Sequence, residues 1–303
     1  MEIHKYAAID IGSNAVRLLT KNVIEVEGKS PQFKTTSLVR VPIRLGADVF
    51  KFGKISERNI RRMESAMQGF KLLMEAHEIE AYRAYATSAM RDAENGEELA
   101  DKIKAQTGIS IKIIEGKHEA VIIARTDLHE LVRKNKTYLY VDVGGGSTEF
   151  TVFSEGRALA SKSFELGTVR LLNESVHKGM WGEAEAWVKK HTAEFRKIYL
   201  IGSGGNINHL FSRSGKKPGA PLNFGYISSY YQFLKALTYE ERVSHLKMKL
   251  DRADVIVPAI HIYLSAMKWS DARKLYVPKI GLADGIIKSI YNDRKKSLSG
   301  ELR

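Results

Sequence analysis

The sequence predicts an α/β fold of two similar halves that face each other across a phosphate-binding cleft. Apolar runs typical of strands alternate along the chain with runs of helical period. A strand, an aspartate, a glycine-containing turn and a second strand follow one another twice, around Asp10 and again around Asp142. A chain of 303 residues, 44% of them hydrophobic, is also long enough for two domains with separate cores.

The first strand-turn-strand unit lies near the N-terminus. Residues 7–19 comprise an apolar strand that reaches Asp10, a polar turn that contains Ser13 and Asn14, and a second apolar strand. Laying Asp10 on Asp142 matches apolar-Asp-apolar-Gly in both copies. We therefore expect two related hairpins, each of which supplies an aspartate and a phosphate loop.

The second unit is the decapeptide Val-Asp-Val-Gly-Gly-Gly-Ser-Thr-Glu-Phe at residues 141–150, between two apolar strands. Consecutive glycines let backbone N–H groups point into one concavity and let a ligand approach the main chain closely. Asp142 and Glu149 place carboxylates at the mouth of this loop, where oxygen ligands suit a hard cation that bridges protein and phosphate. A tight turn with two exposed acids is the alternative for so short a motif. The candidate phosphate-binding residues of the loop are Gly144, Gly145, Gly146 and Ser147.

Between the two hairpins, the sequence predicts a helix and then a strand that ends near an arginine. Apolar residues from 56 to 77 recur every three or four positions, which is the period of an amphipathic helix. A strand at residues 81–86 follows and leads to Arg91. The planar, permanently charged guanidinium suits a phosphate clamp. The alternative is a surface ion pair with Asp92 or Glu94.

Glu119 follows a predicted strand at residues 109–114 and precedes a helical pattern at residues 121–131. It therefore stands at or near the first turn of a helix that links the two halves. An acidic residue there complements the helix dipole. If it faces a phosphate cleft, the same carboxylate would act as general base towards a water, with its pKa raised by burial.

A third glycine loop follows the strand-like residues 198–200. Its residues Gly204, Gly205 and Asn206 open a helical pattern, and a helix N-terminus preceded by glycines favours anions. The basic, glycine- and proline-containing stretch 213–223 predicts a mobile loop.

The absence of an internal low-complexity linker predicts a domain boundary where the chain crosses directly between the halves. We expect an N-terminal domain at residues 1–124 and a C-terminal domain at residues 125–303. The last helix, at about residues 282–296, is a candidate for packing back on the first domain.

Composition excludes several kinds of site. Cysteine is absent and the nine histidines are scattered, so disulfides, a thiol nucleophile and a Cys/His zinc site are not expected. No apolar run approaches the roughly 20 residues that span a bilayer, and no N-terminal signal pattern is visible. We therefore expect a cytoplasmic protein without a membrane partner.

The net charge of +13 and the sequence pI of about 9.6 indicate either a negatively charged partner or a solvated basic surface. No dense basic run with interleaved aromatics precedes the C-terminal Arg294-Lys295-Lys296, and the common nucleic-acid-binding motifs are missing. We expect no nucleic acid partner. A polyanionic substrate and a merely solvated surface account for the charge equally well.

Eight motifs in order resemble those of a known family. The paired hairpins resemble the actin, hexokinase and chaperone ATPase superfamily. Within that superfamily, the whole set is similar to the exopolyphosphatase and guanosine pentaphosphate phosphohydrolase (Ppx/GppA) family, as far as about Tyr291. The motifs are AIDIGSN, ATSAMRDA, IIEGKHEA, VDVGGGSTEF, ELGTVRL, IGSGGNI, RADVIVPA and IGLADG.

The resemblance implies two actin-like (ribonuclease H-like) domains and a hydrolase that acts on phosphoric anhydrides. Its substrate would be inorganic polyphosphate or guanosine pentaphosphate. Its cofactor would be Mg²⁺, and Mn²⁺ is equally suited to an all-oxygen site. Members of the family are usually homodimers. The roles carried over are a general base for Glu119, metal binding for Asp10, Asp142 and Glu149, and phosphate binding for Arg91, Ser13, Asn14, Gly144, Gly145, Gly146, Ser147, Gly204, Gly205 and Asn206.

Some features depart from the family pattern. Many members carry two adjacent acids where this chain has His118 and Glu119, and a hydroxyl residue is common at Asn206. The chain also stops at Arg303 without the helical C-terminal region of the long exopolyphosphatases, which indicates a short, two-domain form.

We expect an exopolyphosphatase that removes the terminal phosphate of polyphosphate. One alternative is a guanosine pentaphosphate 5′-phosphohydrolase. The others are an ATPase or phosphotransferase of the same superfamily and a non-catalytic protein that binds polyphosphate or the alarmone.

Overall fold

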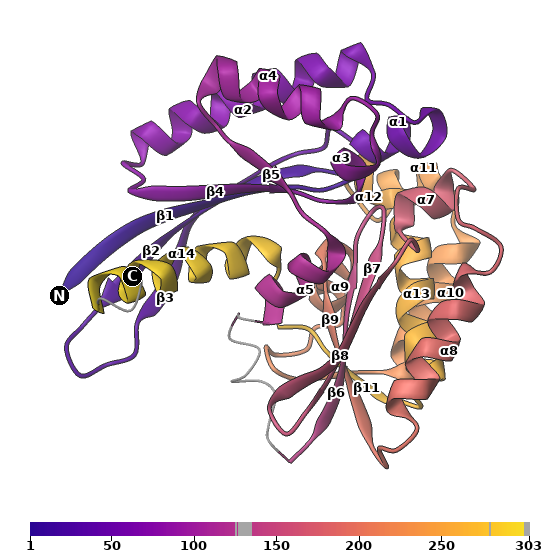
Figure 1. Cartoon of the computed structure of the whole chain (residues 1–303). Helices are drawn as coiled ribbons and strands as arrows, with labels where there is room; N and C mark the ends of the chain where they lie inside the picture. Colours follow the sequence, from indigo (N-terminus) through magenta and orange to yellow (C-terminus); the bar gives the residue numbers. More distant parts are fainter. Residues whose placement is uncertain (125, 127–134, 279, 300–303) are drawn as a thin grey trace. The chain divides into compact units, whose positions relative to one another are not determined.

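The computed structural model describes residues 1–124, 126, 135–278 and 280–299 (Figure 1). The chain divides into two compact units. Unit 1 contains residues 1–126 together with 281–303, and unit 2 contains residues 127–280. The C-terminal helix therefore belongs with the N-terminal half of the chain and not with the segment that precedes it.

Unit 1 is built on a five-stranded sheet in the order β3-β2-β1-β4-β5. The first three strands form an antiparallel meander, whereas β4 and β5 run parallel to β1. The strands are β1 (Glu2–Ile11), β2 (Val16–Glu25), β3 (Gln32–Val41), β4 (Ala81–Ala86) and β5 (Ile111–Ile113).

One face of this sheet packs against helices that supply most of the core of unit 1. Side chains of β1 alternate between the two faces. Ala7, Ile9 and Ile11 contribute to a core with Met63, Met67 and Phe70 of α2, and with Leu99 and Ile103 of α4. The helices of unit 1 are α1 (Leu45–Phe52), α2 (Glu57–Ala76), α3 (Ser88–Asp92), α4 (Gly96–Thr107), α5 (Gly116–Ala124) and α14 (Leu282–Ser299).

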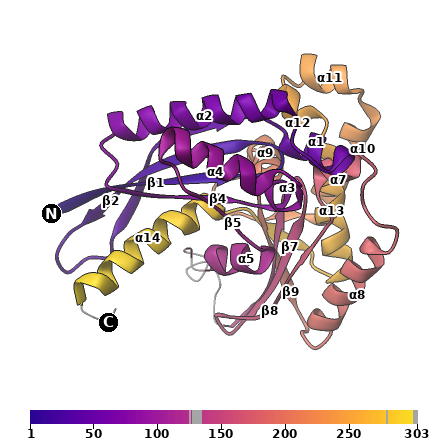
Figure 2. The ribbon, with the colours of Figure 1, turned by 45° about the horizontal axis from the view of Figure 1, so that its top comes forward.

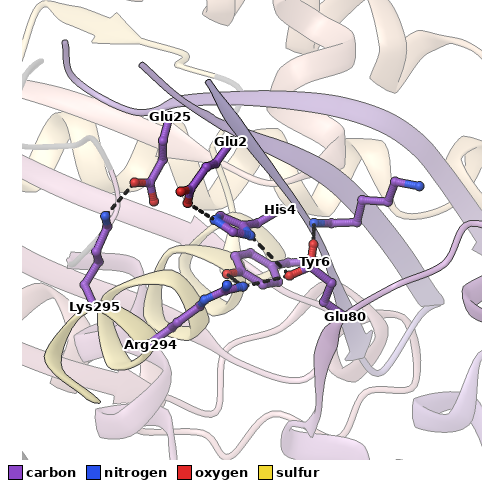
Figure 3. A network of polar contacts seen from close by, with 8 residues as sticks. Glu2, His4, Tyr6, Glu25, Glu80, Arg294 and Lys295 are labelled. Carbon is purple, nitrogen blue, oxygen red and sulfur yellow. Dashed lines mark hydrogen bonds and ion pairs between the residues drawn. The ribbon is translucent and has the colours of Figure 1, made fainter. Parts of the chain in front are cut away.

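The opposite face of the sheet carries the C-terminal helix α14 (Figures 1 and 2). Arg294 donates to the Tyr6 hydroxyl at 3.1 Å and pairs with Glu80 at 2.7 Å, and Lys295 pairs with Glu25 at 2.5 Å. Figure 3 shows these contacts converging on the same region as His4. Arg294 and Lys295 thus bind α14 to β1, to the end of β2 and to Glu80.

Close packing also joins α14 to α5 within unit 1. A Cβ atom on Gly285 would stand 2.5 Å from the carbonyl oxygen of Ile122. The two helices therefore approach to a distance that only glycine permits at this position, because real Cβ contacts are not so short.

Unit 2 repeats the topology of unit 1 on a six-stranded sheet in the order β10-β11-β9-β6-β7-β8. β6, β7 and β8 form an antiparallel meander like that of β1, β2 and β3, and β9 and β11 run parallel to β6. The strands are β6 (Thr137–Val143), β7 (Thr148–Ser154), β8 (Arg157–Phe164), β9 (Ile198–Ser203), β10 (Leu222–Asn223) and β11 (Lys274–Tyr276).

Helices cover one face of the unit 2 sheet, where Leu139, Val141 and Val143 of β6 enter the core. The apolar helix α13 lies at the centre of this layer and supplies Ile256, Ile260 and Tyr263. The helices are α7 (Thr168–Leu172), α8 (Met180–Thr192), α9 (Gly205–Arg213), α10 (Phe224–Ala236), α11 (Tyr239–Ser244), α12 (Leu250–Ala253) and α13 (Ile256–Trp269).

Most predicted elements are present, with a few differences in extent. The helix expected at 121–131 begins earlier, at Gly116, and its predicted end lies outside the described residues. The strand β3 and the short helices α1 and α3 have no counterpart in the prediction. In the described ranges, no helix is both long and apolar enough to cross a membrane.

Candidate functional site

The two predicted hairpins occupy equivalent places in the two sheets. Asp10 lies near the end of β1 and Asp142 near the end of β6, the strand at which each sheet changes from antiparallel to parallel pairing. Both turns close in the same way: Gly12 N–H donates to the Ala15 carbonyl at 3.1 Å, and Gly144 N–H donates to the Ser147 carbonyl at 2.9 Å. The sequence repeat is therefore also a structural repeat.

The N-terminus of α7 fixes the orientation of the glycine loop 144–146. Thr168 N–H donates to the Gly144 carbonyl at 3.0 Å, and Val169 N–H donates to the Gly145 carbonyl at 2.8 Å. The buried guanidinium of Arg170 donates through Nε to the Gly146 carbonyl at 2.8 Å. All three glycine carbonyls thus point towards residues 168–170.

This orientation decides where the N–H groups of the loop point. In a planar trans peptide, the N–H of the next residue points opposite to the carbonyl, and no cis peptide bond occurs in the described part of the chain. The N–H groups of Gly145, Gly146 and Ser147 therefore point away from α7. Successive backbone N–H groups directed to one side favour an anion.

Asp142 and Glu149 face each other directly across the β6–β7 ladder, so their side chains lie on the same face of the sheet. Glu149 is almost fully buried. Its Oε1 accepts from the hydroxyls of Ser147 at 2.6 Å and Ser163 at 2.8 Å. Ser147 thereby links the carboxylate to the glycine loop. The two acids and the loop predicted from residues 141–150 form one cluster.

The third glycine loop adjoins the same cluster. Ser203, at the end of β9, lies level with Asp142 of β6. Gly204 has a φ of 112°, which side chains rarely adopt, and its missing Cβ would stand 3.5 Å from the Asp142 Oδ1. Gly205 and Asn206 are the first residues of α9. Asp142 therefore lies between two loops that the sequence predicted separately.

Two buried tyrosines donate hydrogen bonds to residues of this cluster. Tyr263 donates its hydroxyl hydrogen to the Ser203 carbonyl, and Tyr140 donates to Asp142 Oδ2 at 3.4 Å. Burial raises the pKa of both phenols well above the usual value, and the nearby Asp142 adds to the effect. Both tyrosines thus stay protonated as donors at neutral pH. Neither was predicted, because nothing in the sequence distinguishes them from ordinary core residues.

In unit 1, the predicted acid Asp10 is buried beside a cation. Arg17 lies opposite Asp10 in the β1–β2 ladder, and its Nη1 is 3.3 Å from Asp10 Oδ2. Burial raises the pKa of Asp10, Arg17 opposes this shift, and Asp284 of α14 adds to it. Asp284 itself pairs with Lys21 at 2.6 Å. The two hairpins therefore differ in one respect, since an arginine stands in unit 1 where Glu149 stands in unit 2.

The loop that contains Ser13 and Asn14 packs on two elements that were not predicted. The buried Ser13 hydroxyl lies 2.9 Å from that of Ser88, the first residue of α3. Gly46 N–H of α1 donates to the Ser13 carbonyl at 2.8 Å, and Arg44 N–H donates to the Asn14 carbonyl at 3.1 Å. Ser88 and Arg44 thus belong beside the predicted loop.

Glu119 and Arg91 lie in unit 1 near the start of α5. Glu119 is partly buried in the first turn of α5, as expected. The preceding His118 contacts the ring of Tyr85, which is level with Asp10 in the neighbouring strand. The start of α5 therefore lies on the sheet face that bears Asp10.

Arg91 makes the pairing that the sequence left as the alternative to a clamp. Its Nε is 3.5 Å from Asp92, and its Nη1 donates at 3.0 Å to the carbonyl of Ile114, two residues before α5 begins. In this arrangement, Arg91 supports the chain segment that leads to Glu119.

The donor chemistry of unit 2 fits a magnesium ion. The residues available are carboxylates and hydroxyls, which Mg²⁺ prefers over nitrogen or sulfur ligands. Within the described ranges, no three acidic or histidine side chains lie close enough to form a complete metal site by themselves. Mg²⁺ is usually held by one or two carboxylates together with substrate phosphates. The facing pair Asp142 and Glu149 matches that requirement.

Comparison with known proteins places the chain in a phosphatase family. The sequence profile of the Ppx/GppA phosphatase family matches residues 23–293. Exopolyphosphatase 2 of Mycobacterium tuberculosis is 33% identical over 182 residues, which cover 58% of this chain and 56% of that protein. The guanosine-5′-triphosphate,3′-diphosphate pyrophosphatase of Photobacterium profundum is 31% identical over 167 residues, 55% of this chain and 32% of that protein. The matches thus span about half or less of these curated relatives.

The fold is shared over almost the whole length of a solved structure. The crystal structure of an exopolyphosphatase from Cytophaga hutchinsonii superposes with a TM-score of 0.79 at 24% identity, and the match covers 96% of this chain and 98% of that one. This likeness, together with the repeated sheet topology, confirms the predicted α/β fold with two actin-like domains.

Proposed function

Because this chain belongs to the Ppx/GppA phosphatase family, we propose that it hydrolyses the terminal phosphoanhydride bond of inorganic polyphosphate. The observation that carries the proposal is the glycine loop of unit 2. Its carbonyls are held by residues 168–170, its N–H groups point the other way, and the carboxylates of Asp142 and Glu149 adjoin it. Such a loop binds phosphoryl oxygens without any nucleophilic side chain.

In the proposed reaction, the terminal phosphoryl group lies on the N–H groups of Gly145, Gly146 and Ser147. Glu119 takes a proton from a water molecule, whose oxygen then attacks the terminal phosphorus. The bridging P–O bond breaks, and the products are inorganic phosphate and a polyphosphate shorter by one unit. Neutralised phosphoryl charge and an oriented water are what phosphoryl transfer chiefly requires.

We propose Asp142 and Glu149 as the Mg²⁺ ligands of unit 2 and Asp10 as the candidate Mg²⁺ ligand of unit 1; Mn²⁺ suits the same oxygen ligands. When bound, the ion supplies positive charge at the phosphoryl oxygens.

A second candidate is hydrolysis of the 5′-phosphate of guanosine pentaphosphate. The 31% identity to the Photobacterium profundum protein favours this candidate, because that protein is a guanosine-5′-triphosphate,3′-diphosphate pyrophosphatase. The 33% identity to the mycobacterial exopolyphosphatase and the net charge of +13 favour polyphosphate as the first choice.

We also propose that the protein forms a homodimer. Light scattering after size-exclusion chromatography would measure its mass in solution.

The test is phosphate release in Mg²⁺ from long polyphosphate, tripolyphosphate, guanosine pentaphosphate and ATP, measured side by side. We expect release from polyphosphate and little from ATP. Release from guanosine pentaphosphate alone would replace the first function with the second. Release from ATP alone would move the protein to the ATPases, and binding of polyphosphate without any release would leave a binding protein.

A further inference from the structure

Three strands of unit 2 begin with the same short sequence, a lysine and a tyrosine separated by one residue. The triplets are Lys136-Thr137-Tyr138, Lys197-Ile198-Tyr199 and Lys274-Leu275-Tyr276. They lie at the starts of β6, β9 and β11, which are adjacent and parallel in the sheet, with Lys136 and Lys197 directly before the first residues of β6 and β9. The fold therefore brings three lysines from separate parts of the sequence together at one edge of the sheet.

The strand register places the three lysines on the same face. Tyr138 lies level with Tyr199, and each lysine two residues earlier shares the face of its tyrosine. Leu275 lies level with Leu200, so Lys274 is level with Tyr199. Neighbouring strands are about 4.8 Å apart and Lys274 lies two residues further along its strand, so the three Cα atoms span roughly 12 Å.

The side chains gather around Tyr199. The Nζ atoms of Lys136 and Lys197 lie 4.8 Å and 5.6 Å from the centre of its ring. The rings of Tyr138 and Tyr276 flank it at 5.8 Å and 6.0 Å. A hydrogen bond from Lys197 lowers the pKa of the Tyr199 phenol, and the charges of Lys136 and Lys274 act in the same direction.

Like charges at such spacing repel one another, and the acids of the described residues do not balance them. In the part of the chain that the structure describes, no carboxylate pairs with Lys136, Lys197 or Lys274. Two carboxylates from nearby turns pair with arginines instead: Glu155 with Arg157 at 3.8 Å, and Asp271 with Arg273 at 3.1 Å. A bound polyanion would relieve the repulsion.

We propose that Lys136, Lys197 and Lys274, the lysine patch, bind the distal part of an inorganic polyphosphate chain. The identity of the ligand rests on the proposed function. The patch lies at the opposite end of β6 from Asp142, six residues and about 20 Å away at 3.3 Å per residue. A short oligophosphate held by the glycine loop does not reach this patch, whereas a long chain does.

The burial of the aromatic rings favours polyphosphate over nucleic acid. Binding of single-stranded nucleic acid usually depends on bases that stack on exposed aromatic faces. Tyr138 and Tyr199 are only 4% and 9% exposed. The patch thus offers ammonium groups to phosphate oxygens but few ring faces to bases.

The experiment measures polyphosphate binding to the Glu119→Gln chain, which keeps long chains intact during the measurement. The patch variant carries Lys136→Ala, Lys197→Ala and Lys274→Ala. A control variant removes three exposed lysines on the helical side of unit 2, Lys178, Lys190 and Lys235, so that the change in net charge is the same. A third variant replaces the patch lysines with arginine. Thermal unfolding checks that all variants are folded.

We expect the patch variant to bind long polyphosphate about 5- to 100-fold more weakly, as three exposed ion pairs allow. The control and arginine variants should stay within about twofold of the parent chain, and tripolyphosphate binding should be unchanged in all. Equal losses in the patch and control variants, or no loss in the patch variant, would overturn the inference.

Single-stranded RNA with the same number of phosphates provides the last comparison. Binding as tight as that of polyphosphate, with the same dependence on the patch, would assign the site to nucleic acid and overturn the inference. Because binding is measured without turnover, the result is independent of whether the wild-type chain hydrolyses polyphosphate, so failure of the proposed function is seen separately.

Discussion

Substitution of Gly167 by alanine tests whether the contact between α7 and the glycine loop organises the site. Gly167 immediately precedes α7, and its φ of −112° is one that alanine readily adopts, so any effect is steric. The added Cβ would stand 2.3 Å from the Gly145 carbonyl oxygen and 2.3 Å from the Gly146 carbonyl carbon. Ordinary contact begins near 3.4 Å, so the loop must move by about 1 Å.

The displacement predicts a larger loss of activity than of stability. It strains the hydrogen bonds from residues 168–170 to the loop, at 3.0, 2.8 and 2.8 Å, and turns the loop N–H groups from their direction. A 1 Å misplacement of a binding group costs about 100-fold in rate. Overpacking of this kind costs about 1–3 kcal/mol in the free energy of unfolding.

The assay combines initial rates of phosphate release with thermal unfolding. Gly182→Ala is the matched control, because a Cβ there meets nothing within 4 Å and the residue lies inside α8. We expect the control to keep full activity and to gain about 0.5–1 kcal/mol of stability. Wild-type rates in the folded Gly167→Ala variant would show that the contact between α7 and the glycine loop does not control the orientation of the loop N–H groups.

Two further predictions concern metal and pH. Asp142→Asn should raise the Mg²⁺ concentration that gives half-maximal activity by about tenfold or more, since a neutral amide is a poorer ligand, and a titration with Mg²⁺ after removal of metal measures this. Unaltered Mg²⁺ dependence would exclude Asp142 as a ligand. Burial, with Arg252 and Arg213 nearby, lowers the pKa of His209 from 6.5 to about 4. The unfolded chain therefore binds the extra proton between these values, and stability should fall as pH drops from 6.5 to 4, by about 1–2 kcal/mol because solvent screens the half-buried imidazole. Urea unfolding at several pH values should show this fall in wild type and a shallower one in His209→Gln; equal slopes would contradict it.

The local features of the fold were predictable from the sequence, whereas the edges of the sheets were not. Both hairpins, the helix at 57–76 and the third glycine loop follow from periodicity and glycine placement. Strand β3 was missed because its residues are mostly polar and partly exposed, so the apolar alternation that marks a strand is weak. The packing of α14 on β1 depends on distant contacts, such as that of Arg294 with Tyr6.

The same distinction holds for the candidate site. The sequence placed Asp142, Glu149 and the glycine loop together because they are consecutive. The role of Arg170 in holding the loop was not visible, since its partner, the Gly146 carbonyl, is 24 residues away. The lysine patch was hidden for the same reason, because its three lysines become neighbours only through the strand order β11-β9-β6.

The role of Glu119 as general base is tested by comparing wild type with Glu119→Gln on long polyphosphate in Mg²⁺. Phosphate release reports turnover, and binding of the same polymer reports whether the site is intact. We expect the variant to lose turnover by at least about 100-fold, the contribution typical of a general base, while its affinity for polyphosphate stays close to that of wild type. A variant that binds and releases phosphate at the wild-type rate would contradict the proposed mechanism.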